Sequence, residues 1–225
     1  MTAGLPRPVI CLVTDRHRVS PPGEGGLLRL IAHAAQAGVD LIHLREPSLS
    51  GRALFELTGA AVAAAAGTPA RIVVNDRLDI ALAADAHGVH LRADSVSADR
   101  MRPLAPPGFV IGRSVHSLSE AVAAAQSGAD YLVAGTVYPT PSKPGGRLLG
   151  IDGLATIAAA VDVPVLAIGG VVADKVWDVA ATGAAGLAAI GLFADATTDT
   201  DGRLDRHLRD LLARLRAAFR PPARG

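Results

Sequence analysis

The feature that most constrains this chain is one short pattern that recurs along it. An alanine-rich segment ends at or near a glycine, and a short apolar run follows within a few residues. The copies are AAQAGVDLIHLR (34–45), AADAHGVHLR (83–92), AAQSGADYLVAG (124–135) and AATGAAGLAAIG (180–191). Glycine suits the left-handed position after a helix, and a continuous apolar run of about five residues is typical of a strand buried on both faces. The repeat therefore predicts helix–strand units that build a parallel sheet.

The same alternation extends over the rest of the chain. Strands are predicted near residues 9–14, 39–44, 71–74, 87–91, 109–114, 130–135, 163–168 and 186–190. Helices are predicted near residues 24–37, 50–66, 77–84, 96–104, 117–127, 150–160, 173–182 and 203–219. Eight strand–helix units are the number in the (β/α)8 TIM barrel. The chain length of 225 residues is also close to the typical length of that fold, about 250 residues.

We therefore expect the α/β class and a single (β/α)8 TIM barrel over residues 1–225, with flexible ends near 1–7 and 220–225. The alternative is a doubly wound open sheet. That fold usually carries a glycine-rich phosphate fingerprint that opens a helix after the first strand. The glycines of VTDRHRVSPPGEGG do not open a helix directly in that spacing, so the barrel is favoured.

Composition restricts the partners. Half of the residues are apolar, and the formal net charge is +1, which gives no general attraction to nucleic acid or anionic lipid. The single cysteine, Cys11, excludes a disulfide within one chain and fits a reducing cytoplasm. Neither a signal peptide nor an apolar run of membrane-spanning length is evident. We expect a cytoplasmic protein with no nucleic-acid or membrane partner.

Polar side chains follow most of the predicted strands. In TIM barrels the active site lies at the C-terminal ends of the strands, so these residues are expected to meet at one mouth. In chain order they are Thr14, Asp15, His43, Arg45, Glu46, Asn75, Asp76, Arg77, His90, Arg92, Asp94, Ser95, Ser114 and His116. The long loop after the sixth strand adds Thr140, Ser142 and Lys143.

Two of the strand ends are expected to bind an anion. Gly169, Gly170 and Gly191 follow the seventh and eighth strands, where barrels frequently hold a phosphate on backbone N–H groups. Glycine lets the backbone approach the oxygens, and a following helix supplies free donors. The alternative is a pair of tight turns. The loop with Thr140 and Lys143 could close over an anionic substrate, or it could be a solvent-exposed excursion.

Other polar residues leave two interpretations open. Asn75 and Asp76 could bind a metal or orient a substrate, or they could cap the next helix. His43 lies inside an apolar strand, which is more typical of a packed residue, although Arg45 is two positions on and faces the same way. His116 directly follows the fifth strand, and imidazole is the usual group for moving protons near neutral pH.

Taken together, these segments resemble the thiamine phosphate synthase superfamily. The resemblance is carried, in order, by HLRE, NDRLDIAL, GRSVHSLSEA, YPTPSKPG and AIGG. It extends over roughly residues 9 to 195 and is specific as a set. The superfamily has the (β/α)8 fold, in agreement with the repeat. It implies a phosphorylated thiazole as the small-molecule substrate, and a homodimer.

The superfamily has two branches. Synthases join hydroxymethylpyrimidine diphosphate to a thiazole phosphate with Mg²⁺ and expel pyrophosphate. The resemblance places their Gln-x-Arg-x-Lys substrate motif on His43, Arg45 and Pro47, so the glutamine and the lysine are missing. It places their metal ligands on Asp76 and on Ser95, with Asp94 one residue early. Loss of a carboxylate weakens a Mg²⁺ site.

The second branch, the TenI-like thiazole tautomerases, resembles IHLREPS and IGRSVHSLSEA more closely. We therefore expect a tautomerase that makes a carboxythiazole phosphate aromatic without any cofactor or metal. The resemblance implies His116 as the proton shuttle, Arg45 on the carboxylate, His43 and Ser114 on the ring, and the three glycines on the phosphate. Asn75, Asp76, Thr140 and Lys143 complete the predicted substrate site. The alternatives are a Mg²⁺-dependent synthase that uses Asp76 and Asp94, or a non-catalytic barrel that binds thiazole or thiamine phosphates.

Overall fold

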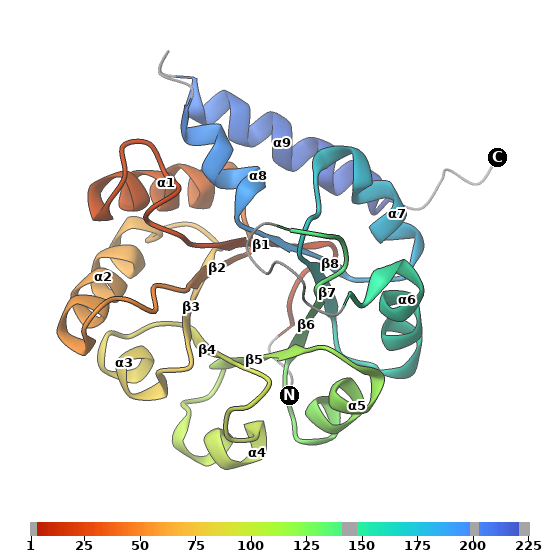
Figure 1. Ribbon diagram of the computed structural model, residues 1–225. Coiled ribbons are helices and arrows are strands. Elements are labelled where there is room, and N and C mark those ends of the chain that lie inside the picture. Colours follow the sequence, from red (N-terminus) through yellow and green to blue (C-terminus); the bar gives the residue numbers. More distant parts are fainter. Residues whose placement is uncertain (1–3, 141–147, 199–202, 221–225) are drawn as a thin grey trace.

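The chain folds into a closed eight-stranded parallel barrel surrounded by helices (Figure 1). The computed structural model describes residues 4–140, 148–198 and 203–220. Every strand pairs in parallel with its neighbour in the sequence, and β1 pairs with β8 to close the barrel. This confirms the predicted (β/α)8 TIM barrel and excludes the open doubly wound sheet.

The elements lie close to their predicted positions. The strands are β1 (Val9–Val13), β2 (Leu41–Leu44), β3 (Arg71–Asn75), β4 (Gly88–Leu91), β5 (Val110–Val115), β6 (Tyr131–Gly135), β7 (Val165–Ile168) and β8 (Gly186–Ala189). The longer helices are α1 (Glu24–Ala37), α2 (Gly51–Ala64), α5 (Leu118–Gln126), α6 (Gly150–Ala160) and α9 (Leu204–Ala218). The shorter ones are α3 (Leu78–Ala83), α4 (Ala98–Met101), η1 (Arg102–Leu104), η2 (Ala173–Lys175), α7 (Val176–Ala181), α8 (Gly191–Ala194) and η3 (Asp195–Thr198).

The repeat has a structural basis in the residue just before the strand. Asp40 and Asp130 follow the helix-ending glycine, and their carboxylates accept the backbone N–H of Ile10 and Ile111 on the preceding strand, both at 2.7 Å. His87 makes the equivalent bond, with Nδ1 accepting from the N–H of Ile72 at 3.0 Å. These side chains tie each new strand to its neighbour. The repeated Gly-x-Asp therefore sets strand register as well as ending a helix.

The apolar residues form two clusters, as the barrel requires. The larger cluster lies between the strands and the surrounding helices. The smaller one fills the inside of the barrel and includes Val9, Leu41, Val73, Tyr131 and Leu166. Branched apolar residues are the usual filling of such barrels, so the buried tyrosine in this cluster is unusual.

The structure departs from the expected elements after β8. Two short helices, α8 and η3, stand between β8 and α9, where none was predicted, because four-residue helices have too few positions to show a periodic pattern. The flexible ends expected near 1–7 and 220–225 lie partly outside the described residues and stay a prediction. Within those residues, no helix combines the length and the apolarity needed to cross a membrane.

Barrel closure depends on Gly186. A Cβ at this position would lie 1.9 Å from the carbonyl oxygen of Val9, the residue with which it pairs. Gly186→Ala is therefore expected to destabilise the fold by at least about 1–3 kcal/mol, the usual cost of overpacking. Gly59→Ala, inside α2 with nothing near the added methyl, is expected to stabilise it by about 0.5–1 kcal/mol. Urea unfolding of both variants tests this, and equal stabilities would contradict it.

Candidate active site at the mouth of the barrel

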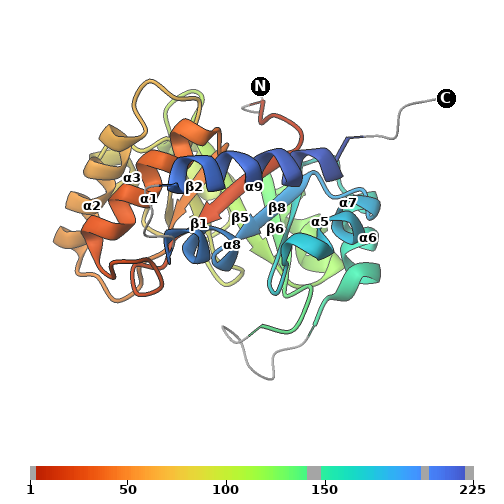
Figure 2. The same cartoon turned by 90° about the horizontal axis from the view of Figure 1, so that it is seen from above.

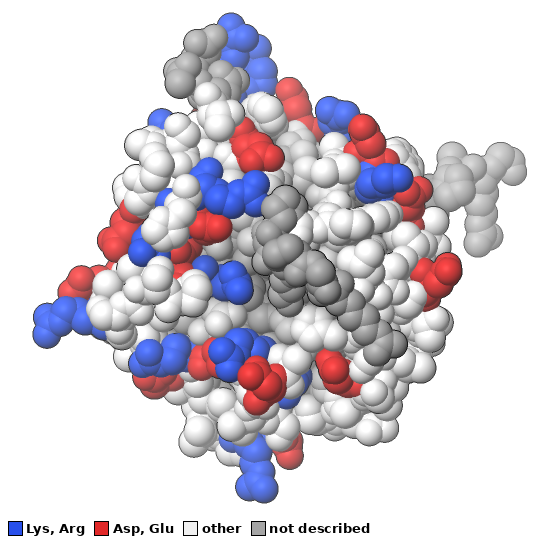
Figure 3. Space-filling model, in the orientation of Figure 1, with Lys and Arg blue, Asp and Glu red and all other residues white. Residues whose placement is uncertain are grey.

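The C-terminal ends of the strands surround one cavity of about 730 Å³. Residues 136–140 and 148–149, which follow β6, extend beyond this end of the barrel, and the N-terminal segment lies at the opposite end (Figure 2). The hollow is visible in the space-filling view, with Lys and Arg side chains gathered on the side nearest α1 to α4 (Figure 3). The predicted site residues that line it are His43, Arg45, Asn75, Asp94, Ser114, His116, Thr140, Gly169, Gly170 and Gly191. Asp76 is not among the residues that line the cavity, although it contacts Arg92, which is. Lys143 lies outside the described residues.

His43 and Asn75 form the floor of the cavity at β2 and β3. His43 Nε2 donates to Asn75 Oδ1 at 3.2 Å, and the His43 ring lies 4.4 Å, centroid to centroid, from the ring of His90. Burial lowers the pKa of His43 to about 4, the nearby Arg45 charge adds to that effect, and the bond to Asn75 opposes it. At neutral pH, His43 is therefore an uncharged hydrogen-bonding group.

This buried histidine makes stability depend on pH. The pKa of His43 is about 4 in the folded protein and about 6.5 in an unfolded chain. The unfolded state therefore binds more protons between these values, and stability falls as the pH drops from about 6.5 to about 4, by up to about 1.4 kcal/mol per pH unit. His43→Gln should reduce the slope, the rest of which comes partly from the buried His90, whose pKa is also lowered by burial; His207→Gln at an exposed position should leave the slope unchanged. Denaturant midpoints at several pH values measure this, and a slope unchanged in His43→Gln would contradict it.

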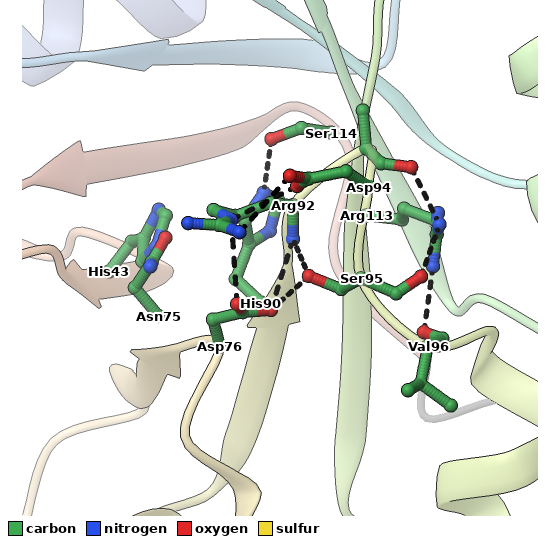
Figure 4. A network of polar contacts seen from close by, with 11 residues as sticks. His43, Asn75, Asp76, His90, Arg92, Asp94, Ser95, Val96, Arg113 and Ser114 are labelled. Atoms are coloured by element: carbon green, nitrogen blue, oxygen red, sulfur yellow. Dashed lines mark hydrogen bonds and ion pairs between the residues drawn. The ribbon is translucent and has the colours of Figure 1, made fainter.

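Acidic and basic groups alternate at the ends of β3 and β4 (Figure 4). Asp76 has φ 59°, a left-handed conformation that aspartate tolerates better than most residues. Its carboxylate accepts a short hydrogen bond from the Ser95 hydroxyl and lies 3.4 Å from Arg92 Nε. Arg92 also makes two bonds of 3.1 Å to Asp94. The Arg92 guanidinium therefore joins the two carboxylates, and Asp94 faces Arg92 rather than Asp76.

Arg113, within GRSVHSLSEA, fixes the loop that carries Asp94 and Ser95. Its guanidinium donates to the carbonyl oxygens of Ala93, Ser95 and Val96 at 2.8–2.9 Å. Three bonds from one rigid, planar group hold the loop against β5. This arginine has a positioning role that sequence reasoning did not assign.

The opposite side of the mouth is built from glycines and one arginine. Gly169 and Gly170 have φ 97° and 64°, and a Cβ at either would lie about 2.5 Å from the segment after β6. Gly191 begins α8, whose four residues give little helix dipole. Arg18, from the loop after β1, pairs with Asp195 at 3.3 Å, and its Nη2 would lie 3.3 Å from a Cβ on Gly191. Arg18 is therefore the cation that the described residues place at this side of the cavity.

His116 lies on the same cavity as the glycines. Its Nδ1 donates to the carbonyl oxygen of Gly135 at 2.5 Å, and the ring is exposed at the rim. Its backbone N–H donates to Glu120 at 2.8 Å, and Ser117 accepts from the backbone of Glu120. Ser117 is thus the N-cap of α5, and Glu120 binds the backbone of the residue before it. Within the motif, Ser117 and Glu120 therefore help to start α5.

Sequence reasoning missed Arg18 and gave no role to Arg92, although both line the cavity. Arg18 lies five residues beyond the end of β1, whereas the residues predicted to reach the mouth from this strand were Thr14 and Asp15. Glu46 serves the structure, because its buried carboxylate accepts from the backbone N–H of Arg16 and pairs with the Arg16 side chain at 3.3 Å. The described residues contain no group of three or more His, Cys, Asp or Glu side chains that could hold a metal ion by itself.

Comparison with known proteins identifies the family. The family described as thiamine monophosphate synthase matches residues 10–193. The chain belongs to this family. A thiamine-phosphate synthase of Methanoculleus marisnigri is 42% identical over 83% of this chain and 88% of its own length. One from Roseiflexus castenholzii is 39% identical over 82% and 80%. The structure of a thiamine phosphate pyrophosphorylase from Pyrococcus furiosus aligns with TM-score 0.79 and 31% identity, over 95% of this chain and 98% of the other.

These relatives correct the functional expectation. The tautomerase interpretation is wrong, because the relatives at about 40% identity are named thiamine-phosphate synthases. The isomerase activity and the assignment of His116 as its proton shuttle fall with it. The interpretation depended on GRSVHSLSEA and on the histidine at position 43. The structure shows why the first is a weak discriminator, since Ser117 and Glu120 cap α5 and Arg113 holds a loop.

Proposed function

We propose that this protein is a thiamine-phosphate synthase, a transferase that joins hydroxymethylpyrimidine diphosphate to a thiazole phosphate and expels pyrophosphate. Relatives that carry this name over four fifths of the chain support the proposal. The observation that carries it in the structure is the division of the cavity. A side with Arg45, Arg92 and Asp94 faces a side with Arg18 and glycines, which suits two separate anionic groups. Asp76 contacts Arg92 from just outside the lining residues.

The diphosphate is assigned to the side formed by β2, β3 and β4. Arg45 lines the cavity there, its backbone is held by Thr14 at 2.9 Å, and its guanidinium meets no partner among the described residues. An arginine fork is the usual donor to phosphate oxygens. Arg92 offsets only one of the two negative charges on Asp76 and Asp94, so a diphosphate beside these carboxylates favours Mg²⁺ on this side.

The oxygen groups at this rim fit a Mg²⁺ ion that is shared with the substrate. Mg²⁺ is commonly bound through one or two carboxylates, with substrate phosphates and waters completing its ligands. Asp76 would be the principal ligand, because its carboxylate is 27% exposed and is oriented by Ser95, and Asp94 would join if it left Arg92. When bound, the ion would neutralise charge on the departing pyrophosphate.

The thiazole phosphate is assigned to the side formed by β7, β8 and Arg18. Backbone N–H groups near Gly169, Gly170 and Gly191 would contact its oxygens, and the Arg18 guanidinium would balance its charge. His43, Ser114 and His116 lie between the two sides, where the rings of the two substrates would meet. There the uncharged His43 would orient a ring by hydrogen bonding. His116 Nε2, whose ring is held through Nδ1 by Gly135, would contact the ring or a phosphate.

The proposal is tested by product formation. Purified protein with both substrates and Mg²⁺ is expected to release thiamine phosphate and pyrophosphate in equal amounts, and EDTA or omission of either substrate is expected to stop it. Binding of the two substrates without turnover would instead favour a non-catalytic barrel. Absence of product with correctly folded protein and excess Mg²⁺ would overturn the proposal.

Two further expectations belong with this function. We propose a homodimer and a cytoplasmic location, as the family resemblance and the single reduced cysteine favour. Exposed apolar side chains such as Phe55, Leu118 and Trp177 offer surface for self-association, although they are scattered over several helices. Light scattering at micromolar concentration measures the oligomeric state, and a mass near 22.9 kDa would contradict the dimer.

A further inference from the structure

A chain of hydrogen bonds runs from inside the barrel to the floor of the cavity. The Tyr131 hydroxyl lies 3.0 Å from His90 Nδ1, and His90 Nε2 lies 2.9 Å from the Ser114 hydroxyl. Figure 4 shows the second of these contacts. The three residues come from the adjacent strands β6, β4 and β5. Tyr131 and His90 are buried, and Ser114 lines the cavity.

The barrel makes specific room for this chain. Gly112 pairs with Tyr131 across β5 and β6, and a Cβ on Gly112 would lie 2.1 Å from the Tyr131 ring. The tyrosine can therefore occupy the barrel interior only because residue 112 has no side chain. A buried hydroxyl and a buried imidazole are costly unless both are hydrogen-bonded, and the chain meets that requirement.

The direction of the chain follows from the single proton on Tyr131. His90 Nδ1 is the one hydrogen-bond partner of the Tyr131 hydroxyl among the described residues. A buried donor without an acceptor is costly, so the phenol must donate to Nδ1. Burial raises the pKa of Tyr131 and lowers that of His90, which keeps the phenol protonated and the imidazole neutral. A neutral imidazole that accepts at Nδ1 carries its proton on Nε2, and therefore donates to Ser114.

We propose that Tyr131 and His90 are positioning residues that fix Ser114 as a hydrogen-bond donor to the bound substrate. Because the Ser114 oxygen already accepts from His90, its own proton is directed to the cavity. Ser114 would then bind an unprotonated acceptor, such as a ring nitrogen or a phosphate oxygen, and would discriminate against a donor at the same place. The role toward substrate rests on the proposed function, whereas the proton position on His90 does not.

Nitrogen-15 NMR of protein labelled at histidine tests the direction without any substrate. The His90 resonances, assigned by their loss in His90→Gln, are expected to show protonated Nε2 and unprotonated Nδ1 at neutral pH. Tyr131→Phe should convert them to a mixture of both forms, and Tyr138→Phe, the control at the only other tyrosine, should leave them unchanged. Protonated Nδ1 in the wild-type protein would overturn the inference, even if Tyr131→Phe failed to fold.

Kinetics test the role toward substrate. Tyr131→Phe is expected to lower kcat/KM about 2- to 10-fold, the scale of one neutral hydrogen bond, and Ser114→Ala by at least as much. Ser114→Thr, which keeps the hydroxyl, should restore part of the loss. Unchanged kinetics in Ser114→Ala would overturn this role. If the wild-type protein forms no thiamine phosphate but His90 is protonated at Nε2, the proposed function fails and the hydrogen-bond direction stands.

Discussion

Asp76→Asn is expected to lower kcat/KM for thiamine phosphate formation by about 10²-fold or more, the scale of losing one charged group at the reacting centre. Asparagine keeps an oxygen for the Ser95 hydroxyl and tolerates the left-handed backbone at this position. The substitution therefore removes the charge and preserves the local fold. Without that charge, Mg²⁺ loses its principal protein ligand, and the charge on the departing pyrophosphate is no longer neutralised as well.

The matched control for this experiment is Asp85→Asn. Asp85 also has a left-handed backbone, with φ 53°, but it is exposed at the end of α3, away from the cavity. Its replacement should leave turnover unchanged. The Asp76 variant should also need more Mg²⁺ for half-maximal rate. Turnover within about twofold of wild type in Asp76→Asn would exclude this carboxylate from the metal site.

The second large effect is that Arg45→Ala and Arg18→Ala each raise the Michaelis constant of a different substrate. Arg45→Ala is expected to raise KM for the pyrimidine diphosphate by about 10- to 100-fold, the scale of a charged hydrogen bond, with little change for the thiazole phosphate. Arg18→Ala should do the reverse, because Arg18 lies beside Gly191 on the other side of the cavity. The effect of Arg18 should be the smaller, since that side also has backbone donors.

Initial rates measured while each substrate is varied in turn give the four constants. Arg52→Ala, on the exposed start of α2, is a control for loss of a nearby positive charge. Equal effects of Arg45→Ala on both substrates would contradict the assignment of the two sides. So would an Arg18→Ala variant that is impaired only toward the diphosphate.

The fold could be predicted from the sequence because each repeat indicates where a helix ends and where the next buried strand begins. Glycines such as Gly38 and Gly128 have left-handed backbones after their helices, and the apolar runs behind them are the buried strands. Strand boundaries agree within two residues for this reason. The short α8 was missed, because four residues carry no periodic signal.

The site could be predicted only as a set of residues. In TIM barrels the active site lies at the C-terminal ends of the strands, and this rule correctly predicted that His43, Asn75, Ser114 and His116 line one cavity. The rule gives no side-chain directions within loops, so it could not show that Arg92 joins Asp76 to Asp94. It also could not separate the structural part of GRSVHSLSEA from the chemical part, and that led to the wrong branch of the family.

We propose that two anionic substrates meet across one barrel mouth, and a crystal structure with thiamine phosphate, pyrophosphate and Mg²⁺ tests this most directly. We expect pyrophosphate and the ion beside Asp76 and Arg45, and the thiamine phosphate group beside Gly169, Gly170 and Arg18. Pyrophosphate on the glycine side, or thiamine phosphate bound outside the cavity, would contradict it.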